Sequence, residues 1–330
     1  MNFSFNESIS RKKIVLIMAL AVVFSLALCV IFGEIGLPLF SAFYAVLILA
    51  DRSSKKVVSL AACAITLAVT VSLYIFNLGT LALPFACVGG VLISVLFAKG
   101  TPKGELAFYL TTIFVVMLVG SLYLSFATAA GNYSLSAVAE YINGWYAELR
   151  LEFVNSIMDA VKETSSELFV AIDEITVSET FDSLFNLAPA AIVIFAFALA
   201  GVSLKIFSTL AYKLAKEPQH VVFWRFSTSN VIAYFYCALF VLNFFAAGNG
   251  VFSITVSNLF YVFLAVYAYI GYNFALSLLS GRLGYALSVI ILIAAIIFFG
   301  IIALELMSLL GVVFTHISNK VGWHIDSDKS

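Results

Sequence analysis

Runs of apolar residues, most of them long enough to cross a lipid bilayer, follow one another along this chain. An α-helix needs about 20 apolar residues to cross the hydrocarbon core. Apolar residues make up 63% of the sequence and charged residues only 11%. A soluble fold with that little charge could not cover its surface, since about 25% is usual. The chain is therefore predicted to be an all-α, polytopic helical bundle embedded in the lipid bilayer.

Nine apolar runs are the predicted transmembrane helices. By residue number they cover 14–32, 37–50, 57–76, 80–98, 106–129, 185–210, 230–247, 251–279 and 285–313. The second run is short for a span, so whether it crosses, and hence on which side the C-terminus lies, stays open. A tight turn is predicted at 280–284, between the last two runs.

One long polar stretch, residues 130–182, separates the fifth run from the sixth. It holds ten of the eighteen acidic residues and only two basic ones, Arg150 and Lys162. The predicted organisation is a membrane block at 1–129, this insert at 130–182, a second block at 183–314 and a polar tail at 315–330.

The insert itself is predicted to be helical. Apolar residues recur at helical spacing from Val138 to Phe153, and Gly144 is interpreted as a break. The sequence at 164–167 matches a capping box that would open a second helix. Two interpretations remain: a helical cap resting on the membrane surface or the bundle, and a lid or docking surface for a partner.

The basic residues indicate an orientation. With the N-terminus inside, thirteen of the seventeen lysines and arginines lie at inner ends or inner loops. The insert then lies outside the cell, and the C-terminus is expected there too.

Sequence motifs give no support to catalysis. The chain has no GxxxxGK[ST] loop, no HExxH, no GxSxG and no paired Cys/His spacing. Its four cysteines all fall inside apolar runs, where cysteine acts as a small hydrophobe. The net charge of −1 gives no basis for binding nucleic acid. We expect no enzyme activity, no cofactor and no metal site.

Small residues recur every four positions on the first predicted helix, at Ala21, Ser25, Cys29 and Gly33. Such a ladder lets a second helix approach closely. The second helix could belong to the chain's own bundle or to a membrane protein partner.

Polar residues on the last three predicted helices are candidates to face a ligand. In hydrocarbon such groups need partners, so they are expected to point inward, where a small solute could bind. The alternatives are hydrogen bonds between helices, interfacial tyrosines and, for the carboxylate, a position near the outer interface. The candidates are Asn230, Tyr234, Asn258, Tyr261, Tyr269, Tyr272 and Glu305.

Two short motifs carry a resemblance to a known family. Phe223-Trp224-Arg225-Phe226 leads into the closing helices, and Asn258-Leu259 lies in the penultimate one. With about five spans before a polar insert, the chain resembles the YybS-like family of bacterial multi-pass membrane proteins. Its N-terminal part is similar to the substrate-binding (S) components of energy-coupling-factor vitamin transporters. That resemblance implies a six-helix bundle for a small vitamin, in the plasma membrane of a bacterium. It also implies docking of the first helix, where Ala21 matches the family's alanine, onto a partner driven by separate ATPases.

The favoured function is therefore transporter-like: binding of a small solute from outside, without an ATPase of its own. The solute would lie between the seventh and eighth predicted helices, with the insert as cover. The alternative is a non-transporting membrane scaffold. Its cytoplasmic aromatic segment at 220–226, or its insert, would recruit a cell-envelope or signalling partner.

Overall fold

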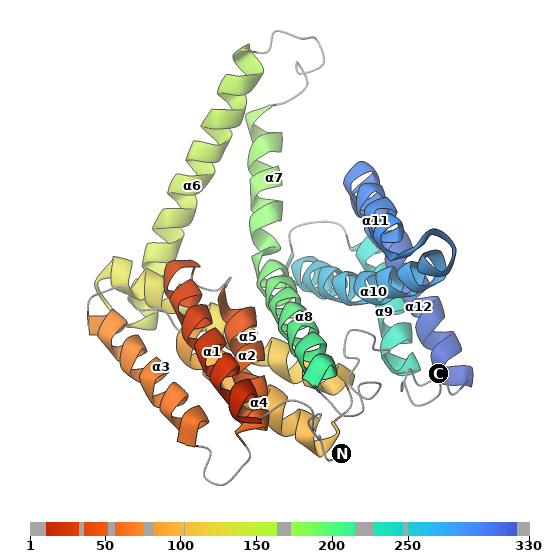
Figure 1. Ribbon diagram of the computed structural model, residues 1–330. Coiled ribbons are helices and arrows are strands. Elements are labelled where there is room, and N and C mark those ends of the chain that lie inside the picture. The colour runs from red at the N-terminus through yellow and green to blue at the C-terminus, as the bar shows by residue number, and fades with distance from the viewer. Residues whose placement is uncertain are drawn as a thin grey trace.

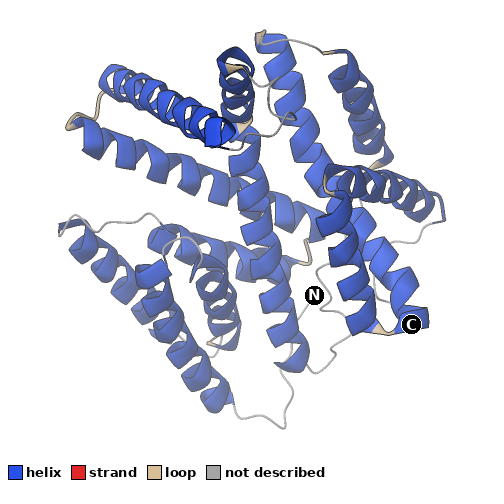
Figure 2. Ribbon diagram, turned by 90° about the horizontal axis from the view of Figure 1, so that it is seen from above, coloured by secondary structure: helices blue, strands red, loops and turns tan. Residues whose placement is uncertain are grey.

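The computed structural model describes residues 11–32, 36–51, 57–75, 82–101, 103–163, 173–214, 228–246 and 250–321. All regular secondary structure within these residues is helical (Figures 1 and 2). The helices are α1 (Arg11–Phe32), α2 (Leu37–Ala50), α3 (Val57–Ile75), α4 (Ala82–Lys99), α5 (Lys103–Ala130), α6 (Leu135–Glu163), α7 (Glu174–Asn186), α8 (Ala188–Leu214), α9 (Asn230–Phe245), α10 (Val251–Leu283), α11 (Tyr285–Phe299) and α12 (Ile301–Val321).

Six of these helices are long and apolar enough to cross a membrane: α1, α4, α5, α8, α10 and α12. Four shorter apolar helices, α2, α3, α9 and α11, accompany them. Large apolar side chains are exposed on the outer faces, as on α1, where Leu20 and Phe24 are more than 60% exposed. The expectation of an all-α membrane protein is confirmed.

Helices α1 to α5 and α8 share one hydrophobic core, and we call them the first bundle. Helix α8 packs along α5 and α2 and contributes Leu204 and Phe207 to that core. This differs from the boundary predicted at residue 183, which assigned this helix to the second block. Sequence order misled here because the chain leaves the first bundle after α5 and returns to it through α8.

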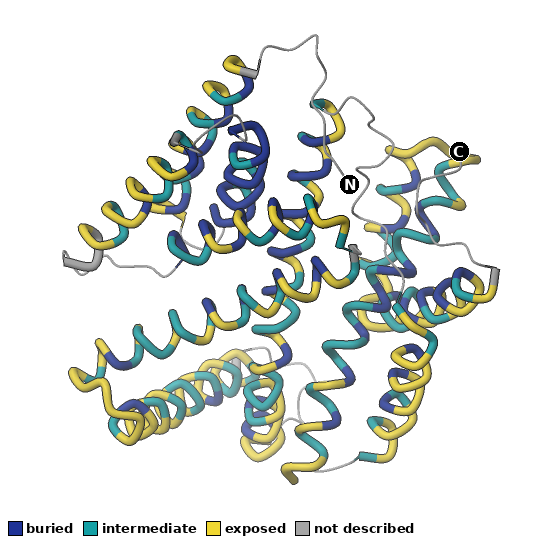
Figure 3. Tube along the Cα trace, turned by 90° about the horizontal axis from the view of Figure 1, so that it is seen from below, coloured by how far each residue is buried: buried dark blue, intermediate teal, exposed yellow. Residues whose placement is uncertain are grey.

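Helix α2 is the centre of the first bundle, and it is buried along nearly its whole length (Figure 3). Its 14 residues span about 21 Å, less than the hydrocarbon thickness of about 30 Å. Protein rather than lipid surrounds it, so a short helix is tolerated. Glycines allow the close packing: a Cβ on Gly36 would lie 2.6 Å from the Cys29 nitrogen, and one on Gly90 2.7 Å from the Tyr44 ring.

A buried carboxylate joins α2 to α3. Asp51, which caps the end of α2, accepts hydrogen bonds from the Ser59 backbone nitrogen at 2.9 Å and the Ser59 hydroxyl at 3.0 Å. The Tyr44 hydroxyl donates to the Ser59 carbonyl at 3.0 Å. Ser59 lies in the first turn of α3, where backbone N–H groups have no partner within the helix. Asp51 therefore caps α3 as well as α2.

Helices α9 to α12 form the second bundle. Its core is an aromatic stack, in which the Tyr236 ring lies 4.8 Å from that of Tyr267 and 6.2 Å from that of Phe260. Helices α10 and α12 approach at two glycines: a Cβ on Gly271 would lie 1.7 Å from the Met307 carbonyl oxygen. One on Gly311 would lie 2.1 Å from the Tyr267 carbonyl oxygen, so neither position has room for a side chain.

The ninth predicted span is two helices, which corrects the prediction. The chain leaves the helical conformation at Gly300, whose φ of 52° favours glycine, and α12 begins at the next residue. The turn predicted at 280–284 is also shorter than expected. Helix α10 continues to Leu283, and only Gly284, with φ of 78°, reverses the chain.

Helices α6 and α7 form an antiparallel pair, the arm, which projects away from both bundles (Figure 1). Helix α6 continues through Gly144, so the predicted break is wrong. Helix α7 begins at Glu174, capped by Asp173, while the capping box at 164–167 lies outside the described residues. Of the arrangements predicted for this stretch, a cap resting on the bundle is not what the structure shows, since the arm projects away from it (Figure 1). Only Leu187, itself in a helical conformation, separates α7 from α8. Helix α7 therefore leads directly into α8.

Candidate functional site

The two bundles enclose a crevice of about 940 Å³ between them. The first bundle contributes α5 and α8 as one wall, and the second contributes α9 and α10 as the other. Its residues are Gly104, Glu105, Ala107, Phe108, Tyr109, Thr111, Thr112 and Val115 of α5; Val193, Ile194 and Phe197 of α8; Thr228, Ser229, Val231, Ile232 and Phe235 at the start of α9; and Val262, Phe263, Ala265 and Val266 of α10. Ligand sites commonly measure about 300–1,000 Å³, so this crevice has the size of one.

The lining of the crevice is predominantly apolar. Aromatic rings stand on both walls, including Phe108, Phe197 and Phe235. The Phe235 ring packs edge-on against Phe263 at 5.5 Å, which holds it in place on its wall. Such a surface favours a ligand with a large apolar part, because each apolar contact removes area from water.

The polar residues of the lining lie at the starts of α5 and α9 and further along α5. Glu105 is the only charged residue among the described lining residues, and it is exposed in the first turn of α5. The hydroxyls of Thr111 and Thr112 donate to carbonyls of their own helix, and Thr228 bonds the Tyr267 hydroxyl at 2.8 Å. The lining is therefore mainly apolar, and its one charged side chain among the described residues lies at the start of α5.

None of the seven predicted ligand-facing residues lines this crevice. Two of the four helices that line the crevice, α9 and α10, are nevertheless the ones predicted to hold a solute. The polar residues predicted for a ligand lie on other faces of these helices, or on α12.

Asn258 lies beside the junction of α7 and α8. Its amide nitrogen donates to the Asn186 carbonyl at 2.7 Å and to the Ile254 carbonyl at 2.9 Å. Its amide oxygen accepts from the Ala190 nitrogen at 2.8 Å. These bonds satisfy the last carbonyl of α7 and a free N–H in the first turn of α8. Asn258 thus joins the second bundle to the first.

Asn230, Tyr234 and Tyr261 lie elsewhere in the second bundle. The Asn230 side chain accepts from the Asn319 amide at 3.0 Å. Tyr234 is 60% exposed on the outer face of α9, and its ring lies 6.5 Å from His316. Tyr261 is half-buried, with its ring edge-on to Phe260.

The remaining three candidates are half-buried. Tyr269 packs edge-on against Phe197 at 5.8 Å, directly behind a ring that lines the crevice. Tyr272 packs against the small core between α10 and α11. Glu305 lies in the second turn of α12, and its carbonyl accepts from the Ser308 hydroxyl at 2.7 Å.

The small-residue ladder on α1 faces the chain's own bundle. Ser25 and Cys29 are fully buried, and Cys29 contacts α2 where Gly36 permits the approach. Ala21 is half-buried, and Gly33 lies outside the described residues. The interpretation as an intramolecular contact fits Ser25 and Cys29.

Sequence reasoning missed the polar contacts that hold the second bundle together. The Tyr236 hydroxyl bonds that of Ser308 at 2.7 Å, and Asn319 donates to the Thr228 carbonyl at 2.9 Å. A signal existed on α12, where small or hydroxyl residues recur every three or four positions and are all buried: Ser308, Gly311, Thr315 and Ser318.

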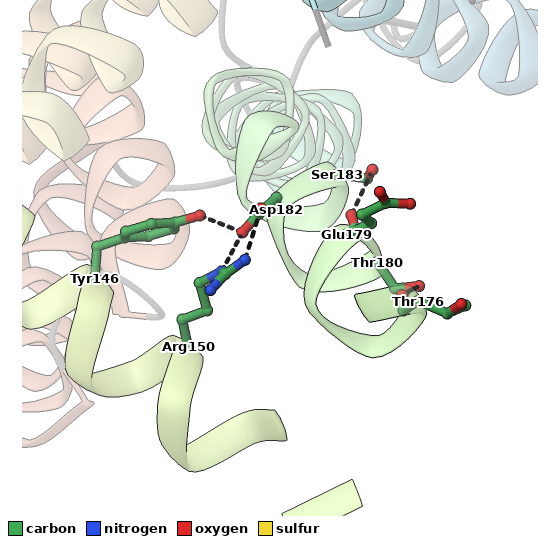
Figure 4. A network of polar contacts seen from close by, with 7 residues as sticks. All are labelled: Tyr146, Arg150, Thr176, Glu179, Thr180, Asp182 and Ser183. Carbon is green, nitrogen blue, oxygen red and sulfur yellow. Dashed lines mark hydrogen bonds and ion pairs between the residues drawn. The ribbon is translucent and has the colours of Figure 1, made fainter. Parts of the chain in front are cut away.

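The arm has its own polar site (Figure 4). The Arg150 guanidinium of α6 donates to both carboxylate oxygens of Asp182 on α7, at 2.8 and 3.3 Å. The Tyr146 hydroxyl donates to the same carboxylate. Hydrogen bonds from Arg150 and Tyr146 lower the pKa of Asp182, and burial together with the Asp182 carboxylate raises the pKa of Tyr146. Both groups are therefore held in the protonation states that keep the two helices joined.

No group of three or more histidine, cysteine or acidic residues within the described part of the chain is arranged to hold a metal ion. The chain matches no protein-family model, no curated protein and no solved structure. The YybS-like resemblance therefore stays a prediction, and its Phe223-Trp224-Arg225-Phe226 motif lies outside the described residues. The fold and crevice define the class: a helical membrane protein with a ligand-sized apolar crevice between two bundles.

Proposed function

We propose that this chain is a multi-pass plasma-membrane protein that binds an amphipathic small molecule in the crevice between its two bundles. This proposal rests on a ligand-sized space whose lining is mainly apolar and includes a few polar residues, among them Glu105 and Ser229. The function is transporter-like, with no ATPase of its own. Its assignment to a bacterium rests on the YybS-like resemblance alone.

The chemistry of the crevice defines the ligand class. An apolar body of the ligand would lie along Phe108, Phe197 and Phe235, while a polar head would lie near Glu105 and Ser229. The sequence-based prediction placed a small solute between two of these four helices, α9 and α10. The ligand would reach the crevice from the membrane, so the arm need not cover it.

The proposed topology places the N-terminus inside and the arm outside, following the basic residues. Nine predicted spans become ten crossing helices, because Gly300 divides the last run. Asn319, near the end of α12, bonds Thr228 and Asn230 at the start of α9, which the charge pattern assigns to the inner side. The C-terminus then lies inside as well, and Lys320 joins the inner basic residues.

Ligand binding is tested by native purification and mass spectrometry of the extracted small molecules. Ile232→Trp should fill the crevice from α9 and remove the co-purified amphiphile. Val241→Trp, on an exposed part of the same helix outside the crevice, should retain it. Equal recovery from both variants, or no amphiphile from the wild type, would count against this function.

Reporter fusions test the topology separately. Alkaline phosphatase inserted in the arm after Asp159 should be active, and the same enzyme after residue 330 should be inactive. A green fluorescent protein at residue 330 should fluoresce. Active phosphatase at residue 330 would restore the nine-span interpretation.

A scaffold is the second candidate, and the arm favours it. The arm projects from the bundles and exposes carboxylates on both helices, including Glu140, Glu152 and Glu179. A scaffold would be recovered with a stoichiometric protein partner and an empty crevice. Deleting residues 135–186 would remove that partner, whereas Ile232→Trp would leave it bound.

A further inference from the structure

The two helices of the arm are joined directly to two helices that line the crevice, α5 and α8. Helix α5 lines the crevice with its first half and leads into α6 through a turn at Gly131, whose φ is 66°. The Tyr123 hydroxyl of α5 donates to the Tyr133 carbonyl across this turn at 2.5 Å. Helix α7 leads into α8, which begins two residues later and lines the crevice from Val193 onward.

Aromatic contacts and an ion pair join the helices at the base of the arm. The Phe126 ring of α5 lies 5.5 Å from Trp145 of α6, and the Tyr146 ring lies 4.6 Å from Phe185 of α7. The ion pair of Arg150 and Asp182 lies one turn before the α7–α8 junction. These contacts join α6 to α7, and only Leu187 separates α7 from α8.

The second bundle contacts the α7–α8 junction through Asn258. Asn258 of α10 holds the Asn186 carbonyl and the Ala190 nitrogen with its side-chain amide. It lies one turn before Val262, where α10 begins to line the crevice, just as Ala190 lies one turn before Val193 on α8. The Asn258 hydrogen bonds thus join α8 to α10 next to the residues with which both helices line the crevice.

We infer that the position of the arm sets the width of the crevice, and that Asn258 is the positioning residue through which the two are coupled. The inference rests on the proposed function only in calling the crevice a ligand site. A partner that binds the arm would thereby change access to the crevice from the membrane. A change of at least about fivefold in access corresponds to the lower end of typical couplings between sites.

The test measures access to the crevice without any ligand. The full chain is first freed of its native cysteines by replacing Cys29, Cys63, Cys87 and Cys237 with alanine. A new cysteine, Ile194→Cys, is then placed on α8 where it lines the crevice. Its rate of labelling by an apolar maleimide is measured in lipid nanodiscs. Asp182→Ala, which breaks the arm contact, should change the labelling rate about fivefold or more. Asp159→Ala should leave it unchanged, because that carboxylate pairs only with the exposed Lys162 in the described structure.

Asn258→Leu supplies the second half of the test. In that background Asp182→Ala should no longer change the rate, so the two substitutions should be non-additive. A reporter on the lipid-facing side, Ile290→Cys, should respond to neither. If the cysteine-free chain does not fold, the same variants can be compared in the chain with its native cysteines. Backbone hydrogen exchange at residues 193–197 then replaces the labelling rate.

Two results would overturn the inference: labelling and exchange that do not respond to Asp182→Ala, or a response that survives Asn258→Leu. Neither depends on whether an amphiphile co-purifies. Failure of the coupling and failure of the proposed ligand site are therefore distinguishable.

Discussion

The first bundle and the second bundle achieve close packing by different means. The first surrounds one short, almost wholly buried helix, α2, with apolar and small residues in a single large core. The second has smaller cores and is joined by stacked tyrosines, hydroxyl pairs and the glycine contact of Gly271 and Gly311. In a membrane, apolar burial alone does not drive helices together, so steric fit and hydrogen bonds must do so. We therefore expect a few positions to determine most of the stability of the second bundle. In the first bundle the stabilising contacts are spread over more residues.

The largest effect is expected at the glycine contact. Gly271→Ala places a Cβ where only 1.7 Å separates it from the Met307 carbonyl oxygen, so α10 and α12 must move apart. We expect a loss of about 3 kcal/mol in the free energy of unfolding, measured by denaturation in mixed micelles. Gly281→Ala on the same helix, with nothing within 4 Å of its Cβ, is the control. Equal stability of the two variants would remove the distinction between the bundles.

The next effect concerns Asp51, a buried carboxylate that joins α2 to α3 in the first bundle. Asp51→Ala removes two hydrogen bonds to Ser59, one of them to a backbone N–H in the first turn of α3. The expected loss is about 2 kcal/mol, because hydrogen bonds to charged groups are stronger than neutral ones. Asp51→Asn retains an acceptor and should lose less in the same unfolding measurement. If the asparagine variant is no more stable than the alanine variant, the capping role of Asp51 is wrong.

A smaller effect is expected within the aromatic stack. Tyr236→Phe keeps the ring on Tyr267 but leaves the buried Ser308 hydroxyl without this partner, at a cost of about 1 kcal/mol. Tyr234→Phe, two residues away and exposed, should change stability by less than about 0.5 kcal/mol. Thermal unfolding in one detergent compares the pair, and the reverse order of effects would contradict the structure.

The smallest effect on the bundles is expected from the arm. The pKa of Asp182 is lowered by Arg150 and Tyr146, so its contribution to the arm is complete at neutral pH. That contribution is lost only as the pH falls through the lowered pKa, below the usual carboxyl value of about 3.9. The pKa of Tyr146 is raised above its usual value of about 10, so the hydroxyl keeps its proton at neutral pH. Its hydrogen bond to Asp182 is lost only as the pH rises through that raised pKa.

Trp145 fluorescence measures this titration once Trp224 and Trp323 are changed to phenylalanine, because the Trp145 ring packs against Phe185 across the arm. The acid transition should disappear in Asp182→Asn, while unfolding of the two bundles should not follow it. An acid transition that persists in Asp182→Asn would assign it to another carboxylate.

Much of the helix placement could be predicted from the sequence. Residues 37–50 are helical as expected, and α9 and α10 begin at the predicted residues, Asn230 and Val251. Gly300 was hidden inside the last run because glycine is common within transmembrane helices, and only its positive φ identifies it as a turn. The place of α8 in the first bundle could not be predicted, because contact with α5 and α2 joins residues far apart in the chain.

The candidate site was less predictable. The helices predicted to hold a solute, α9 and α10, line the crevice together with α5 and α8, but Asn258 points to the α7–α8 junction and not into the crevice. Polar side chains inside a membrane find partners among themselves, so they mark contacts between helices as readily as ligand sites. The crevice is lined by apolar residues that look like any lipid-facing surface in the sequence.

The sequence by itself determined the class of this protein, the position of most helices and the acidic stretch that becomes the arm, because each depends on local hydropathy and charge. Only the tertiary structure decided which apolar faces meet, that α8 belongs with the first bundle, and that a crevice remains beside it. The physical reason is that lipid and a neighbouring helix are about equally apolar. A face such as that of Ile194 and Phe197 therefore carries no sequence signal that distinguishes lipid, protein and ligand.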